Sequence, residues 1–143
     1  MKTFEEYQQE GIVKNIRPDN ERAKSFLEEA RRKLEILSLK KEKLGINDTL
    51  ANDYVEDCYN TILFCIRAKM LEQGFTSSGK GAHEAEVAFA LKIGFSQNDC
   101  IILDQLRYFR NGILYYGKRF DEEYANTIIS FTHKVCKEHF KLP

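Results

Sequence analysis

The 143-residue sequence predicts an all-α protein, an up-and-down helical bundle of about five helices. Apolar residues recur at spacings of three and four over long stretches, which is the period of an amphipathic helix. The chain has two prolines and no clear run of alternating residues between turn signals, so strands gain little support. Connections of a few residues between long helices favour antiparallel neighbours. We expect one domain over residues 1–143, with residues 1–17 as an N-terminal extension.

Glycines and capping residues set the expected helix ends. A short helical stretch at residues 3–10 ends at Gly11, and Pro18 with the acidic residues after it marks the entry to the first long helix. Gly45 and Gly74 follow the last apolar positions of two long helices and suit C-terminal caps. The long helices are expected at about residues 18–44, 47–73, 81–93, 96–117 and from 121 onward.

Composition excludes some classes of protein and leaves others open. Lys plus Arg equals Asp plus Glu at 22 each, so any argument for a nucleic-acid partner must be local. No segment reaches the ~18 uninterrupted apolar residues of a membrane helix. The N-terminal MKTFEEYQQE has no apolar core of a secretory signal. We therefore expect a cytoplasmic protein without a membrane partner.

The four cysteines are scattered, without a Cys-x-x-Cys pair, and all fall inside helical patterns. Cys58 and Cys65 are seven residues apart on one helix face, which favours two small core positions over a zinc site. No histidine pair has metal-ligand spacing, and no Glu-x-x-His motif of a di-iron bundle occurs. We expect reduced, buried thiols and neither a metal nor a cofactor.

The stretch GFTSSGKG, residues 74–81, satisfies the G-x-x-x-x-G-K pattern of a phosphate-binding loop. That loop needs a strand before it and Ser or Thr after the lysine, whereas here a helix is expected before it and Gly81 follows Lys80. A helix cap followed by a flexible link is favoured, and a weak anion site at Lys80 stays open. His83 follows this loop and could titrate near neutral pH.

The stretch RYFRNGILYYGKRF, residues 107–120, is basic and contains no acidic residue. At about 100° per residue, the helix is expected to carry one polar strip, formed by Arg107, Asn111, Tyr115 and Lys118. Its inward side would carry Leu106, Phe109, Ile113 and Tyr116. Arg110 lies between the two beside leucines, where its guanidinium can bind a phosphate or carboxylate with two hydrogen bonds. The alternative is an arginine that packs past those leucines or pairs with a glutamate of the bundle.

The segment LRYFRNGILYYG resembles the HEPN superfamily, whose last core helices carry an Arg, then a polar residue, and then a His four to six residues further on. Arg110 and Asn111 match the first two positions. The preceding DYVEDCYNTILFCIRAKMLEQGF, the Lys/Ser/Gly loop and AHEA are similar to the small stand-alone archaeal and bacterial HEPN proteins. The resemblance covers roughly residues 15–140.

The resemblance implies a helical bundle, commonly a homodimer that brings two Arg-containing helices into one cleft. Many members are metal-independent ribonucleases, often the toxin of a pair with a nucleotidyltransferase antitoxin, and others bind RNA or nucleotides without cutting. This sequence departs from the cutting pattern, because Tyr115, Tyr116 and Gly117 occupy the positions of the family's His. A phenol with a pKa of about 10 is a poor base at neutral pH but can contact a phosphate or stack on a base.

Three functions follow. The first is a non-catalytic or weakly active protein that binds RNA or nucleotide phosphate through Arg107, Arg110, Asn111, Tyr115, Tyr116, Lys118, Lys80 and His83. The second is a metal-independent ribonuclease in which Arg110 and Asn111 act with Tyr115, or with His83 brought from another helix or subunit. The third is a subunit that only contacts other proteins.

Overall fold

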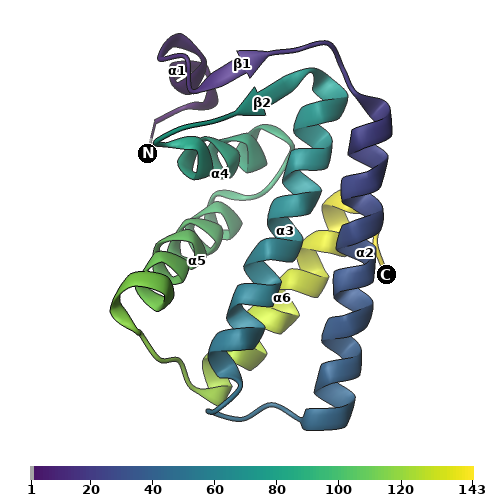
Figure 1. Cartoon of the computed structure of the whole chain (residues 1–143), viewed down its shortest axis with the longest axis vertical. Helices are drawn as coiled ribbons and strands as arrows, with labels where there is room; N and C mark the ends of the chain where they lie inside the picture. Colours follow the sequence, from purple (N-terminus) through teal and green to yellow (C-terminus); the bar gives the residue numbers. More distant parts are fainter. Residues whose placement is uncertain (1) are drawn as a thin grey trace.

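The computed structural model describes residues 2–143, except for the side chains of residues 112–116. Within that range the chain is a helical bundle of six helices with one small hairpin, which confirms the predicted fold class (Figure 1). The elements in chain order are α1 (Phe4–Gln9), β1 (Val13–Asn15), α2 (Asn20–Leu44), α3 (Ala51–Gln73), β2 (Phe75–Ser77), α4 (Ala82–Lys92), α5 (Gln97–Tyr116) and α6 (Glu122–Phe140).

Capping side chains account for most of the helix starts. Thr3 forms a full capping box with Glu6, and Asp19 and Asp121 accept hydrogen bonds from first-turn amides of α2 and α6. The expected start of α3 near residue 47 was wrong. The side chain of Asn47 accepts a hydrogen bond from the Leu50 amide at 2.9 Å and closes a separate turn, so α3 begins four residues later.

Helix α3 is the central element of the bundle. It packs against α2, α4, α5, α6 and β2, and Figure 1 shows α2 running beside it while α6 crosses behind. Buried residues occur around most of its circumference, as expected of a helix that is covered on several sides. Cys58 and Cys65 are both fully buried in it, and all four cysteines are free, buried thiols, as the sequence predicted.

The hairpin was not predicted. β1 and β2 pair antiparallel, with Lys14 opposite Thr76, although about sixty residues separate them along the chain. Each strand has only three residues, too few for an alternating pattern to stand out from the flanking sequence. The pairing also corrects the expectation of a flexible link after Gly74, because residues 75–77 are a strand.

The predicted N-terminal extension is packed into the domain. The rings of Phe4 and Tyr7 on α1 are buried, and Phe4 contacts the rings of Phe75 on β2 and Phe89 on α4. Residues 4–15 therefore cover one end of the bundle, as Figure 1 shows at the top.

Among the described residues, no helix combines the length and the apolar composition that crossing a membrane requires.

Candidate functional site

Arg110 on α5 is half-buried and lies against α3. Its Cζ is 5.7 Å from the centre of the Tyr59 ring, which is within the range of a cation–π contact. The Nε of Arg110 and the hydroxyl of Tyr59 are both buried, and neither has a hydrogen-bond partner in the described part of the chain. The guanidinium is therefore held by a ring and not by a carboxylate.

Arg107, one helical turn earlier, is in the opposite situation. Its Nε donates to Asp104 at 2.9 Å, its Nη1 donates to Glu84 of α4 at 2.8 Å, and its side chain is only 17% exposed. Burial lowers the pKa of Arg107, but the hydrogen bond to Asp104 and the two carboxylate charges raise that pKa overall. The sequence predicted Arg107 on a polar strip available to a ligand. In the structure its charge is instead neutralised by Asp104 and Glu84.

The end of α5 is tied to the start of α3. Asn52 donates to the carbonyl of Lys118 at 2.6 Å and accepts from the amide of Phe120 at 2.8 Å. The Lys118 ammonium lies 5.2 Å from the ring of Phe109 and 5.7 Å from that of Phe120, in an exposed position. Lys118 is thus exposed to solvent beside two aromatic rings.

Three further predicted site residues follow Arg110 on α5. Asn111 follows Arg110 and is partly buried. Tyr115 and Tyr116, which the sequence offers as substitutes for a histidine, have side chains outside the described residues. The question of a tyrosine substitute for the histidine therefore stays a prediction.

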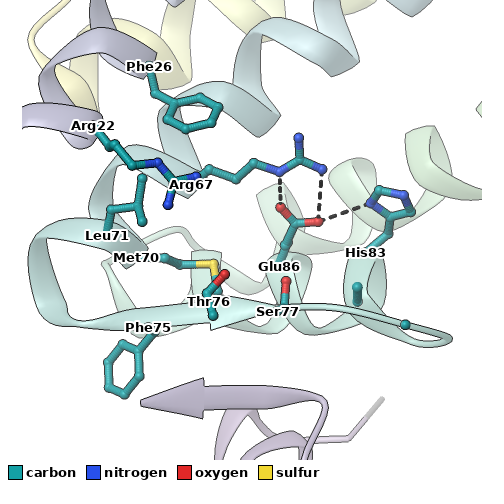
Figure 2. A pocket seen from close by; sticks show the side chains of 12 residues that line it. Arg22, Phe26, Arg67, Met70, Leu71, Phe75, Thr76, Ser77, His83 and Glu86 are labelled. Carbon is teal, nitrogen blue, oxygen red and sulfur yellow. Dashed lines mark hydrogen bonds and ion pairs between the residues drawn. The ribbon is translucent and has the colours of Figure 1, made fainter. Parts of the chain in front are cut away.

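Lys80 and His83 lie at the entrance to α4. Lys80 is exposed in the loop after β2. His83 Nδ1 lies 3.0 Å from Glu86 Oε1. Because a carboxylate accepts hydrogen bonds, the tautomer that makes this bond carries its hydrogen on Nδ1. Arg67 of α3 binds the same carboxylate with two hydrogen bonds, from Nε to Oε2 and from Nη2 to Oε1 (Figure 2). Lys80 and His83 thus come from the loop after β2 and the start of α4, whereas the other predicted site residues come from α5 and the loop after it.

Charged side chains of α3, α4 and α5 all act on the pKa of the Tyr59 hydroxyl. Burial raises the pKa of its hydroxyl, and the negative charge of Glu86 raises it further. The positive charges of Arg110, Arg107 and Arg67 act in the opposite sense without reversing the shift. The Tyr59 hydroxyl therefore stays protonated at neutral pH, where it can donate a hydrogen bond but cannot act as a base.

Sequence reasoning missed Glu86, Arg67 and Tyr59. Glu86 is 2% exposed and is one of few charged residues buried in the described chain. Its signal was present in AHEAEVAFALK, where a glutamate falls among the apolar residues of a short helix. A buried carboxylate needs a cationic partner, but the sequence could not say which arginine supplies it.

Among the described side chains, one group has the spacing to hold a metal ion. Ligand atoms of Asp99, Glu138 and His139 lie within 4.8 Å of one another. Asp99, however, already accepts a hydrogen bond from the Lys134 ammonium at 2.9 Å, and the His139 ring stacks on Phe95 at 4.4 Å. A cation would have to compete with that ammonium, so this group is a poor metal site.

Comparisons of the chain with models of protein families, with curated proteins and with solved structures give no match.

Proposed function

We propose that the chain is a HEPN-like protein that binds RNA or a nucleotide phosphate at the Arg110 edge, formed by Arg110, Asn111 and Lys118, and that it is non-catalytic or weakly active. The observation that carries the proposal is the contrast between two arginines on one helix. Arg107 has two carboxylate partners, whereas Arg110 has none among the described side chains. A desolvated guanidinium without a counter-charge is a strong binding group for phosphate.

Tyr59 supports the same assignment. Its ring holds the guanidinium in place, which lowers the entropy lost when Arg110 binds an oxygen pair. Two buried hydrogen-bond donors without partners on neighbouring side chains are costly in a folded protein. Both atoms are closed to solvent here, so a phosphate at this edge would meet the guanidinium through its terminal nitrogens.

Catalysis has less support than binding. Tyr59 is protonated at neutral pH. His83, whose Nε2 could act as a base while Nδ1 contacts Glu86, lies on α4 and makes no described contact with Arg110. General base catalysis contributes about 10² to 10⁴-fold, so a chain without an effective base would cut RNA slowly at most. The partner nucleotidyltransferase of a toxin–antitoxin pair is part of the same proposal and rests on the resemblance alone.

Fluorescence anisotropy with a labelled single-stranded RNA tests the Arg110 edge. Arg110→Ala should weaken binding about 10-fold and reduce the slope of log affinity against log salt by about 0.7 for the lost phosphate contact. Arg31→Ala is the matched control, because Arg31 is an exposed arginine of α2 and the change removes the same charge. Equal affinities of the two variants would remove Arg110 from the site.

The same proteins test the ribonuclease alternative when they are incubated with RNA in EDTA. Cleavage by the wild-type chain that disappears in Arg110→Ala would make the protein an enzyme and not only a binder. Equal cleavage by both would indicate a contaminating nuclease. Absence of binding together with absence of cleavage would favour the subunit that only contacts proteins.

The homodimer expected from the resemblance has a plausible surface on α5. Ile101 and Tyr108 are 55% and 67% exposed, and they lie seven residues apart on one face of that helix. Sedimentation velocity should show a dimer that Tyr108→Glu converts to a monomer. A monomeric wild-type chain at high concentration would contradict the dimer.

A further inference from the structure

A pocket of about 310 Å³ lies between α2, α3, β2 and α4, near the hairpin end of the bundle (Figure 2). This volume is at the lower end of the range for small-molecule sites, which begins at roughly 300 Å³. It is lined by Arg22, Phe26, Arg67, Met70, Leu71, Phe75, Thr76, Ser77, Gly79, Ala82, His83 and Glu86. No described residue of α5 lines it, so it is separate from the Arg110 edge.

The polar lining of the pocket carries an excess of positive charge. Arg22 and Arg67 contribute two guanidiniums, and Glu86 contributes one carboxylate. That carboxylate already accepts hydrogen bonds from Arg67 and His83, so it does not call for a cationic ligand. Arg67 uses Nε and Nη2 on Glu86 and keeps Nη1 for another acceptor.

Arg22 is the guanidinium available to a ligand. It lies in the first turn of α2 with Cζ 6.0 Å from the centre of the Phe26 ring, and no described carboxylate pairs with it. Figure 2 shows Arg22 and Phe26 entering the pocket from α2, on the opposite side from His83. The hydroxyl groups of Thr76 and Ser77 add two more possible donors from β2.

One wall of the pocket is apolar. Phe26, Met70 and Leu71 form it, and the Phe26 ring is braced by the Phe64 ring at 5.2 Å. A flat ring system can pack against such a wall, while the donors of Arg22 and β2 face its anionic group. The lining therefore matches a ligand that is apolar at one end and multiply hydrogen-bonded at the other.

We propose that this pocket binds a small phosphomonoester that carries a flat ring system, the chemistry of a nucleoside monophosphate. The phosphate lies with Arg22, the free Nη1 of Arg67 and the hydroxyls of Thr76 and Ser77, because several donors suit three strong acceptor oxygens. The ring system lies against Phe26 and its neighbours. The buried Glu86 positions Arg67 and has no contact of its own with the anion.

Isothermal titration calorimetry on the full chain tests this, with AMP, UMP, adenosine and inorganic phosphate as probes. A nucleoside monophosphate should bind with a Kd below about 1 mM, and adenosine and phosphate alone should bind at least about 10-fold more weakly. Arg22→Ala should weaken nucleotide binding by about 10- to 100-fold, because a charge-assisted pair is lost. Arg31→Ala, on the same helix but outside the pocket lining, should bind as the wild type does.

Three results would overturn the proposal. The first is that neither AMP nor UMP binds at about 1 mM. The second is that Arg22→Ala and Arg31→Ala bind the nucleotides with equal affinity. The third is that inorganic phosphate binds as tightly as the nucleotides do. Binding that only Arg110→Ala removes would assign the nucleotide to the other site. Circular dichroism of each variant confirms that it is folded, and Arg22 is exposed enough for its loss to leave the fold intact. The proposal that the Arg110 edge binds RNA is tested separately, by the fluorescence anisotropy experiment.

Discussion

The ion pair between Arg67 and Glu86 gives the sharpest test of how this bundle tolerates a buried charge. The two partners differ in exposure, since the Glu86 side chain is 2% exposed and that of Arg67 is 35% exposed. Arg67→Met leaves a carboxylate that water barely reaches, with His83 as its remaining described partner. Glu86→Gln leaves a guanidinium that water can still solvate. Arg67→Met should therefore lower the free energy of unfolding more than Glu86→Gln does.

Breaking a buried ion pair by removing one partner costs about 3 to 5 kcal/mol. Because His83 remains, we expect about 3 kcal/mol for Arg67→Met, which lowers the melting temperature by about 10 °C in a domain of this size. Glu86→Gln keeps the shape and one acceptor, so it should cost about 1 kcal/mol. The double variant should be more stable than Arg67→Met alone, since it removes the stranded charge.

Urea unfolding followed by far-UV circular dichroism measures all three variants. Arg31→Met is the control, because it makes the same chemical change at an exposed position and should shift the free energy of unfolding by less than about 0.5 kcal/mol. A cost below about 1 kcal/mol for Arg67→Met, or a double variant less stable than that single variant, would refute the reasoning. Either result would mean that Glu86 does not depend on Arg67 for its burial.

Three further predictions concern stability. Gly74→Ala should lower the free energy of unfolding by more than about 2 kcal/mol, because φ at Gly74 is +82° and the new Cβ would lie 2.7 Å from the main-chain oxygen of Ile16. Gly11 has a similar φ of +78° but open space around it, so Gly11→Ala should lower the free energy of unfolding by only about 1 kcal/mol in the same urea titration. Asp121→Ala removes the cap of α6 and should lower the free energy of unfolding by about 1 kcal/mol, and an unchanged urea midpoint would exclude the cap. Burial raises the pKa of Cys58 from 9.0 to about 12 and that of Cys100 to about 11. Between these values and pH 9 the folded chain keeps thiol protons that the unfolded chain loses. The contribution of the two thiols to the free energy of unfolding is therefore complete below pH 9 and declines as the pH rises toward 12. Urea midpoints should therefore fall above about pH 9, and a midpoint that rises there would contradict the burial of these thiols.

The candidate site was predictable in part. Arg110 and Lys118 follow from the basic character of residues 107–120, and the half-buried position of Arg110 agrees with its place beside leucines. Arg107 did not behave as predicted, because the sequence window began after Asp104 and Glu84 lies on another helix. The pocket was not predictable, since its lining comes from four elements spread over residues 22–86.

The sequence by itself determined the helices, their glycine ends and the burial of the thiols. Helical period, caps and breakers act within a few residues of one another, so local composition decides them. Only the tertiary structure decided that β1 pairs with β2, that Glu86 meets Arg67, and that one arginine of α5 is neutralised while the next is not. These contacts join residues 19 to about 60 positions apart, and their partners are chosen by how the helices pack, a choice that periodicity along the chain does not encode.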